Sequence, residues 1–165
     1  MFKKEGLSVL SIIAILVLVF FVGCEKAAEK TIQNATGGKA KIDTNKGTVS
    51  IKTNQGSMEV GGTQTWPSKM PSDVPKLTYG RITGVSETNT PKGLSIFVAI
   101  GGISPAEFDK YQGMLEGAGW KIASVTKADD GLFMHAKKQS SALTVSFSGK
   151  GGKDFSGGVA YTEGK

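Results

Sequence analysis

The strongest constraint on this chain is an uncharged apolar run that ends beside its only cysteine. Residues 7–22 carry no charge, Lys3 and Lys4 precede them, and Gly23 and Cys24 follow. At about 1.5 Å of rise per residue, this run would make roughly 24 Å of helix, which is short of the roughly 30 Å hydrocarbon core of a bilayer. A positive start, a short apolar middle and a small residue at the end are typical of a cleaved export signal.

The end of this run, Phe21-Val22-Gly23-Cys24, resembles a bacterial lipobox, although Phe21 stands where that pattern most often has leucine. The resemblance implies cleavage after Gly23, a diacylglyceryl thioether on the sulfur of Cys24, and often acylation of the new N-terminus. Two acyl chains, at about 0.8 kcal/mol per buried methylene, anchor a protein effectively permanently. We therefore expect residues 1–23 to be a signal peptide and the mature protein to be lipid-anchored on the extracytoplasmic side of the cell membrane or outer membrane. An uncleaved transmembrane anchor and a buried cysteine are the alternatives.

Removal of the leader changes the charge and leaves no disulfide. The chain has 20 basic and 14 acidic residues, and loss of Lys3, Lys4 and Glu5 leaves 18 and 13, a net charge of +5. With its one cysteine acylated, the chain must be stabilised by packing alone. Its lysines are mostly single, whereas nucleic-acid-binding proteins cluster basic residues among aromatic ones. We expect a solvated surface, attracted to anionic lipid, and no nucleic-acid partner.

Prolines divide the mature chain. Three of the five fall within nine residues, at Pro67, Pro71 and Pro75. Because each proline disfavours helix at the preceding residue, this stretch predicts an extended connector over residues 63–76. It separates residues 24–62 from a domain of residues 77–165, which is just large enough for a core without cross-links.

The amino-terminal region predicts a helix followed by a small sheet. Residues 25–36 are rich in helix formers, and two near-repeats, 44–51 and 53–60, each combine an Asn-x-Gly turn with alternating apolar residues. We expect a three-stranded meander with one apolar face, formed by Ala40, Ile42, Val49, Ile51, Met58 and Val60. So small a sheet needs a cover, for which the helix is the local candidate. Sugar or ion binding by the repeated loops is the alternative, but asparagine and glycine suit hairpin turns for backbone reasons alone.

The carboxy-terminal domain begins with two strands and a helix. Residues 81–86 and 94–100 predict strands, and the second is apolar on both faces, which favours a central position. Ser104, Pro105 and Glu107 predict a helix start with a capping box. Its apolar stripe consists of Phe108, Tyr111, Leu115 and Ala118, and Gly119 ends the helix.

Further strands are expected at residues 120–125, 132–137 and 143–148, with a weaker one at 158–162. In the third of these, apolar residues alternate with Thr144, Ser146 and Ser148, as in an antiparallel strand with one wet face. The order β-β-α-β-β-β predicts the α+β class, with a single antiparallel sheet and one helix on one of its faces.

The run from Gly101 to Trp120 resembles the central helix of a group of uncharacterised small bacterial lipoproteins, through Ser104-Pro105, Glu107, Tyr111, Leu115 and Ala118-Gly119-Trp120. In that group a lipobox precedes a short helix, a glycine-rich meander, a Pro-Ser-Asp-Val-Pro-like connector (residues 71–75 here) and an α+β domain. The resemblance implies a location and a fold, and it carries no activity.

Catalytic and metal chemistry find little support. Nucleophilic catalysis generally needs a base, and the only histidine, His135, lies within a predicted strand. Asp129 and Asp130 fit a turn better than a calcium site. Residues 149–153 are basic and flexible but lack the strand–loop–helix setting of a phosphate loop. We therefore predict no catalytic residue, no metal and no cofactor.

Two functional hypotheses remain. The first is a binding module without enzymatic activity, which holds an envelope protein, glycan or other envelope ligand on the sheet face opposite the helix or on loop residues. The alternative is an envelope-polymer hydrolase that uses a carboxylate pair from Glu107, Asp109, Glu116 and Asp154, whose spacing the sequence does not give. A third hypothesis is a structural spacer at the membrane surface. Of the two tryptophans, Trp120 is expected to seal the helix–sheet junction and Trp66 to dock the connector.

Overall fold

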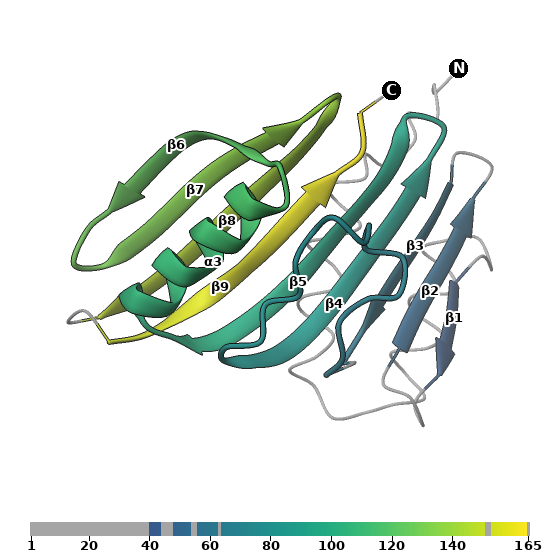
Figure 1. The fold of residues 1–165 in the computed structure, drawn as a ribbon. Coiled ribbons are helices and arrows are strands. Elements are labelled where there is room, and N and C mark those ends of the chain that lie inside the picture. Colours follow the sequence, from purple (N-terminus) through teal and green to yellow (C-terminus); the bar gives the residue numbers. More distant parts are fainter. Residues whose placement is uncertain (1–39, 44–47, 54–55, 63, 151–152, 165) are drawn as a thin grey trace, which may run out of the picture.

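The computed structural model describes residues 40–43, 48–53, 56–62, 64–150 and 153–164. They form one antiparallel sheet of nine strands with a helix on one face (Figure 1), so the predicted α+β class is confirmed in outline. The predicted leader, Cys24 and the predicted helix over 25–36 lie outside the described residues. Within the described ranges, no helix is long and apolar enough to cross a membrane.

The strands run across the sheet in the order β1-β2-β3-β4-β5-β9-β8-β7-β6. Their bounds are β1 Ala40–Asp43, β2 Thr48–Thr53, β3 Gly56–Gly61, β4 Arg81–Thr90, β5 Gly93–Ile103, β6 Lys121–Lys127, β7 Gly131–Lys138, β8 Ser141–Lys150 and β9 Lys153–Thr162. The helix, α3, spans Pro105–Gly117 and leads from the central strand β5 to the edge strand β6.

Four strands follow the helix, one more than β-β-α-β-β-β states. The stretch that sequence marked as weak is the ten-residue strand β9, which pairs with both β5 and β8 in the middle of the sheet. The sequence underestimated it because Ser156, Gly157 and Gly158 have low strand propensity and interrupt the apolar alternation.

Strand β5 is the fifth of nine strands, which confirms its predicted central position. Its two faces differ, however. Ile96, Val98 and Ile100 are at most 1% exposed in the core beneath α3, whereas Phe97 on the other face is 43% exposed. The apolar character of both faces therefore reflects a core on one side and an exposed aromatic ring on the other.

Helix α3 begins with the predicted capping box. The backbone N–H of Glu107 donates to Oγ of Ser104 at 3.3 Å, and the backbone N–H of Ser104 donates to the Glu107 carboxylate at 2.8 Å. Phe108, Tyr111 and Leu115 are at most 1% exposed, as their spacing predicted. Gly119 follows the helix with φ +84°, in the left-handed region that glycine adopts readily.

The amino-terminal meander is continuous with this sheet, because β3 pairs with β4 in antiparallel register. Its predicted apolar face is confirmed in register, since Val49 pairs with Val60 and Ile51 pairs with Met58. Met58 also pairs with Thr88, which places this face on the side opposite α3. Val49 and Ile51 are 7% and 8% exposed. The sheet therefore has apolar residues on one face at β2 and β3, and on the other face from β4 onward.

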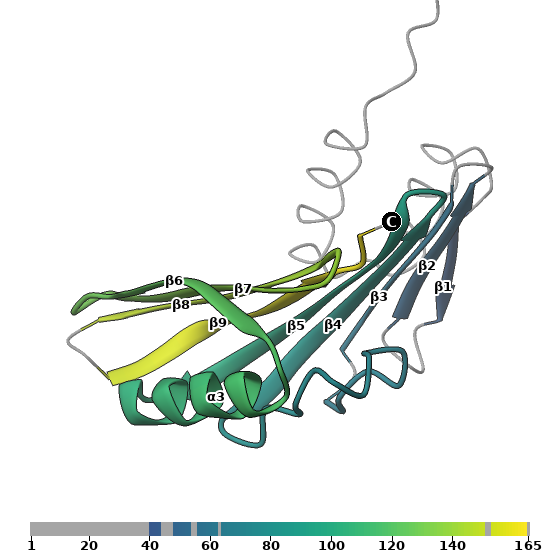
Figure 2. The same cartoon turned by 45° about the horizontal axis from the view of Figure 1, so that its top comes forward.

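The proline-rich connector is folded rather than extended. The N–H of Met70 donates to the carbonyl oxygen of Pro67, and the N–H of Val74 donates to that of Pro71, which makes two tight turns. Met70, Val74 and Leu77 are 7%, 3% and 4% exposed and belong to the same core as α3. Helix and connector thus cover the same side of the sheet (Figure 2).

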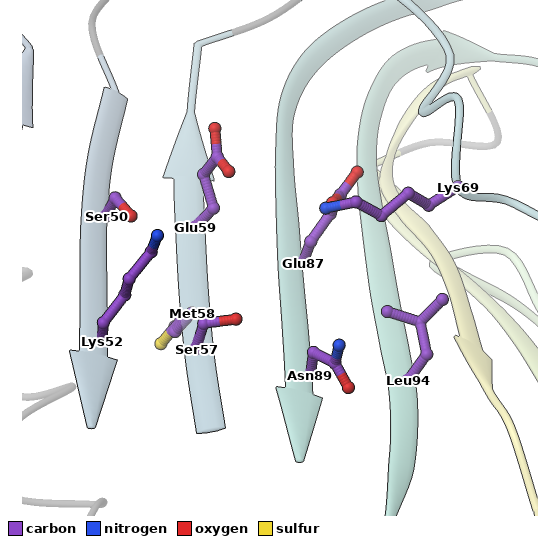
Figure 3. A pocket seen from close by; sticks show the side chains of 9 residues that line it. All are labelled: Ser50, Lys52, Ser57, Met58, Glu59, Lys69, Glu87, Asn89 and Leu94. Atoms are coloured by element: carbon purple, nitrogen blue, oxygen red, sulfur yellow. The ribbon is translucent and has the colours of Figure 1, made fainter. Parts of the chain in front are cut away.

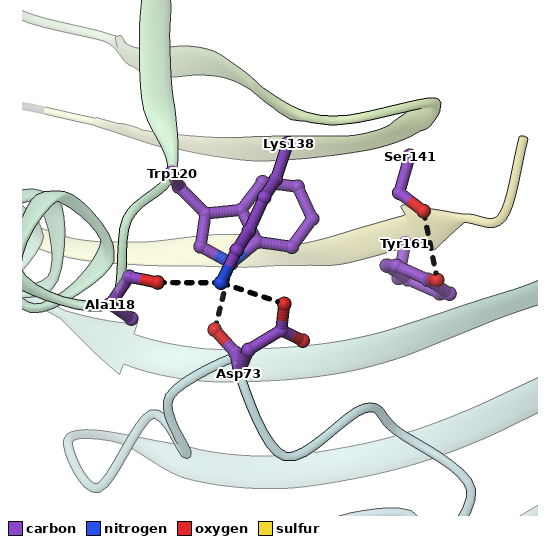
Figure 4. Close-up of polar contacts among 6 residues, drawn as sticks. All are labelled: Asp73, Ala118, Trp120, Lys138, Ser141 and Tyr161. Carbon is purple, nitrogen blue, oxygen red and sulfur yellow. Dashed lines mark hydrogen bonds and ion pairs between the residues drawn. The ribbon is translucent and has the colours of Figure 1, made fainter.

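Polar contacts hold the connector against the helix end (Figure 4). The indole N–H of Trp120 donates to the carbonyl oxygen of Asp73 at 2.7 Å, and Nζ of Lys138 donates to that of Ala118 at 2.7 Å. Lys138 also pairs with the Asp73 carboxylate at 2.9 Å. The Tyr111 hydroxyl donates to the carbonyl oxygen of Pro75 at 3.1 Å. The connector is thus held at two backbone oxygens, those of Asp73 and Pro75, and at the Asp73 carboxylate.

Candidate functional site

The candidate site is the sheet surface opposite α3, which we call the open face. Side chains alternate along a strand, so the neighbours of the buried core residues point to this face. On β8 the core residues Leu143, Val145 and Phe147 alternate with Ala142, Thr144, Ser146 and Ser148. The three hydroxyl residues that the sequence placed on a wet face therefore lie there, and Ser146 and Ser148 are exposed.

Small side chains continue from β8 across its neighbour β9 to β5. Thr144 pairs with Ala160 on β9, which pairs with Phe97 on β5. Ser146 pairs with Gly158 on β9, which pairs with Ala99 on β5. On β5, β9 and β8, the open-face residues within this register are small apart from Phe97: Ser95, Ala99, Gly101, Ser156, Gly158, Ala160, Thr162, Ala142, Thr144, Ser146 and Ser148. The centre of the open face is therefore a floor of methyl and hydroxyl groups.

Two exposed aromatic rings stand on this floor. Phe97 on β5 is 43% exposed and Phe133 on β7 is 39% exposed. They share the open face because Phe97 pairs with Ala160, while Phe133 pairs with Ser146. A Cβ added at Gly158 would lie 2.6 Å from two carbon atoms of the Phe97 ring, so this ring lies over the glycine.

The edge of the open face is polar and basic. His135 lies in register between Thr144 and Ser124, and its Nδ1 is 3.3 Å from Oγ1 of Thr144. Lys121 and Lys137 stand directly opposite each other on β6 and β7, and both are exposed. Like charges placed directly opposite across two strands are mutually unfavourable. An anionic group bound between the two ammonium groups would relieve that repulsion.

The four carboxylates considered for hydrolysis have separate roles. Glu107 accepts the capping hydrogen bonds of Ser104, which lower the pKa of its carboxyl below the ordinary value. Asp109 forms an ion pair with Lys127, and Glu116 accepts a hydrogen bond from Gln112 at 3.0 Å. Asp154 is exposed at the start of β9, with φ +52°. The first three belong to α3, on the side away from the open face.

The remaining candidates have structural surroundings. Among the described residues, no group of three or more His, Cys, Asp or Glu side chains converges to hold a metal ion. Asp129 and Asp130 lie in the turn between β6 and β7, and Gly149 and Lys150 end β8. Trp120 is 3% exposed at the helix–sheet junction, as predicted, and Trp66 packs against the core.

Sequence reasoning identified the hydroxyl residues of the open face but missed its aromatic residues. Phe97 belongs to the strand that the sequence marks as apolar on both faces, and Phe133 is assigned no functional role by the sequence. The signal that could have found them is alternation: Phe97 lies between Ile96 and Val98, so it must face away from them. Comparison of this chain with protein-family models, curated proteins and solved structures finds no match.

Proposed function

We propose that this protein is a lipid-anchored extracytoplasmic binding module whose open face holds an anionic glycan of the cell envelope. The observation that carries the proposal is the exposure of Phe97 and Phe133 on a floor of small hydroxyl-bearing side chains. Exposed aromatic side chains on an ordered surface are typical of recognition sites, because they offer a large rigid contact area.

The spacing of the two rings favours an extended ligand. Two strands, β9 and β8, separate β5 from β7, and neighbouring strands lie about 4.8 Å apart, so the backbones that carry the rings are roughly 14 Å apart across the sheet. A sugar polymer can stack the apolar face of one unit on each ring. Its hydroxyl groups then meet Thr144 and Ser146 on the floor between the rings.

The charge of the open face favours an anionic polymer. None of its residues named above is acidic, whereas Lys121 and Lys137 form an exposed pair at its edge. A phosphate or carboxylate group on the glycan would neutralise this pair. The net positive charge of the rest of the chain also favours an anionic glycan, because it attracts the glycan over a long range, and salt weakens this attraction.

The proposed location, anchored by lipid outside the cytoplasm, rests on the sequence around Cys24. An apolar run preceded by two lysines, a small residue and the sole cysteine in immediate succession support processing to a lipoprotein. The test is intact mass and membrane fractionation of the full chain in a lipoprotein-processing bacterium, compared with the Cys24→Ala variant. We expect the wild type to lose residues 1–23, gain lipid mass and fractionate with membranes. Retention of the leader without added lipid would overturn the anchor.

Binding is tested by co-sedimentation of the purified full chain, in detergent micelles, with insoluble glycan isolated from bacterial envelopes. We expect the double variant Phe97→Ser and Phe133→Ser to lose at least about tenfold in affinity, or about 1.4 kcal/mol. Met114→Ser is the matched control, because Met114 is 36% exposed on α3, on the opposite side of the sheet. Equal binding by both variants would exclude the open face as the site.

Two further outcomes separate this proposal from its rivals. The same assay can use an envelope preparation from which the glycan has been removed and in which the envelope proteins remain. Binding to that preparation would mean that the partner is a protein surface. Release of soluble sugar fragments during the incubation would mean that the protein is a hydrolase. We expect the glycan to remain intact. Its affinity for the protein should fall as salt is added, and this salt dependence should be less steep in the double variant Lys121→Ser and Lys137→Ser.

A further inference from the structure

A second candidate site lies on the other side of the sheet, at the meander. It is a pocket of about 230 Å3 between the connector and strands β2 to β5 (Figure 3). Its lining is almost wholly polar or charged: Ser50, Lys52, Ser57, Met58, Glu59, Lys69, Glu87, Asn89 and Leu94. This volume is below the roughly 300–1,000 Å3 typical of sites for drug-sized ligands, so the pocket suits a molecule the size of an amino acid.

The strand register arranges the polar groups in two rows. Ser50, Glu59 and Glu87 lie side by side on β2, β3 and β4, and Lys52, Ser57 and Asn89 form the next row. Glu87 pairs with the buried Ile96, which places the rows on the same side of the sheet as α3. The pocket is therefore separated from the open face by the thickness of the sheet.

Two like charges face each other at the centre of this pocket. Glu59 and Glu87 are direct partners in the register of β3 and β4, an arrangement that is unfavourable unless cations are near. Lys69, which reaches over from the connector, forms an ion pair with Glu87 at 2.6 Å (Figure 3). That hydrogen bond raises the pKa of the Lys69 ammonium.

The two other charged side chains of the lining are Glu59, whose charge also raises the pKa of Lys69, and Lys52. Within the part of the chain that the structure describes, Glu59 and Lys52 form no ion pair, and both are exposed. They are diagonal neighbours on adjacent strands, a relation that places the two residues about 7–8 Å apart. Figure 3 shows the Lys52 ammonium group pointing into the space between β2 and β3.

We propose that this pocket binds a small zwitterion, namely a free amino acid, which carries both an ammonium and a carboxylate group. Glu59 accepts hydrogen bonds from the ligand's ammonium group, and Lys52 donates to its carboxylate. Ser50, Ser57 and Asn89 supply further hydrogen bonds, and Leu94 contacts the ligand's side chain. The site is independent of the open face, so failure of either proposal leaves the other standing.

The test is isothermal titration calorimetry of the purified full chain in detergent micelles with three probes at concentrations up to about 10 mM. Alanine carries both charges, alaninamide only the ammonium group, and propionate only the carboxylate. We expect saturable binding of alanine, with at least tenfold weaker binding of the other two. Binding of either single-charge probe as tightly as alanine would overturn the zwitterion proposal. Absence of alanine binding would also overturn it, provided that cooperative unfolding shows the protein sample to be folded.

Variants then assign the two charges. Glu59→Gln and Lys52→Met are expected to weaken alanine binding at least tenfold each, because each removes one charge-assisted contact. Lys92→Met is the matched control, since Lys92 is exposed in the β4–β5 turn, outside the lining of the pocket. Alanine affinity that is unchanged in Glu59→Gln and Lys52→Met would show that the ligand binds elsewhere and would overturn the assignment.

Discussion

The indole N–H of Trp120 donates a hydrogen bond to the backbone carbonyl oxygen of Asp73 at 2.7 Å, which joins the end of α3 to a connector 47 residues earlier in the chain. Trp120 is 3% exposed, and its ring meets that of Tyr161 edge to face at 6.4 Å. One side chain thus contacts the helix end, the sheet and the connector. The proline-rich segment is therefore part of the core rather than a spacer between two units.

Replacement of Trp120 by phenylalanine should destabilise the protein by about 2 kcal/mol. The variant keeps an aromatic ring but leaves the partly buried Asp73 carbonyl without its donor, and an unsatisfied group of this kind costs about 1–3 kcal/mol. Urea unfolding followed by far-ultraviolet circular dichroism measures the loss. Trp66→Phe is the control, because Trp66 is only partly buried. Similar losses in both variants would contradict a specific role for the Trp120 hydrogen bond.

Two adjacent lysines should respond differently to alanine substitution. Lys138 donates to the Ala118 carbonyl oxygen at the C-terminus of α3 and pairs with Asp73, whereas Lys137 is exposed on the open face. Because the side chains of Lys138 and Asp73 are 28% and 41% exposed, solvent screening limits the expected loss for Lys138→Ala to about 1 kcal/mol. Lys137→Ala should remain within about 0.5 kcal/mol of the wild type. The comparison uses urea unfolding at neutral pH, and reversal of the order would refute this assignment.

The capping box of α3 should make stability depend on acid pH. The pKa of Glu107 is lowered, first by the hydrogen bond from the Ser104 backbone N–H and then by that from its hydroxyl. A lowered folded-state pKa gives stabilisation that is present above the unfolded-state pKa and is lost as the pH falls through the folded-state value. The advantage of the wild type over Glu107→Gln should therefore be constant near neutral pH and shrink in acid. Thermal unfolding across this range measures it, and an advantage that grows in acid would contradict the sign.

The same motif gives a test at neutral pH. Ser104→Ala removes the side chain that accepts the Glu107 N–H, and such a loss at a helix N-cap typically costs about 1 kcal/mol. Ser104→Asp keeps an acceptor oxygen and should recover most of the stability. Urea unfolding of the two variants checks both expectations, and equal destabilisation by alanine and aspartate would show that capping is not the cause.

Sequence motifs that lie within a few residues of one another predicted the structure that they form. Ser104, Pro105 and Glu107 lie within one turn, so their spacing alone indicated the helix start that the structure contains. The connector was misjudged because its turns depend on docking: Met70 and Val74 are buried only when β4, β5 and α3 are already in place. Strand β9 was underestimated for a similar reason, since Gly158 lies against the Phe97 ring and Gly157 against the backbone of Ser146 and Phe147, contacts that exist only in the assembled sheet. The hydroxyl residues of the open face were predictable from alternation in β8, and alternation also places Phe97 opposite the core, but only the register of β5, β9, β8 and β7 puts the two rings on the same face.

Gly158 provides the sharpest test of that register. A Cβ at this position would lie 2.4 Å from the carbonyl oxygen of Val98 and 2.6 Å from the Phe97 ring, so Gly158→Ala must displace β5 or expel the ring. Overpacking of this kind typically costs about 1–3 kcal/mol. Gly113→Ala is the control, because a Cβ there meets nothing within 4 Å and alanine is favoured over glycine in a helix by about 1 kcal/mol. Thermal unfolding should therefore show Gly158→Ala below the wild type and Gly113→Ala at or above it. If Gly158→Ala matched the wild type, Phe97 would not lie over Gly158, and the arrangement of the open face on which the glycan proposal depends would be wrong.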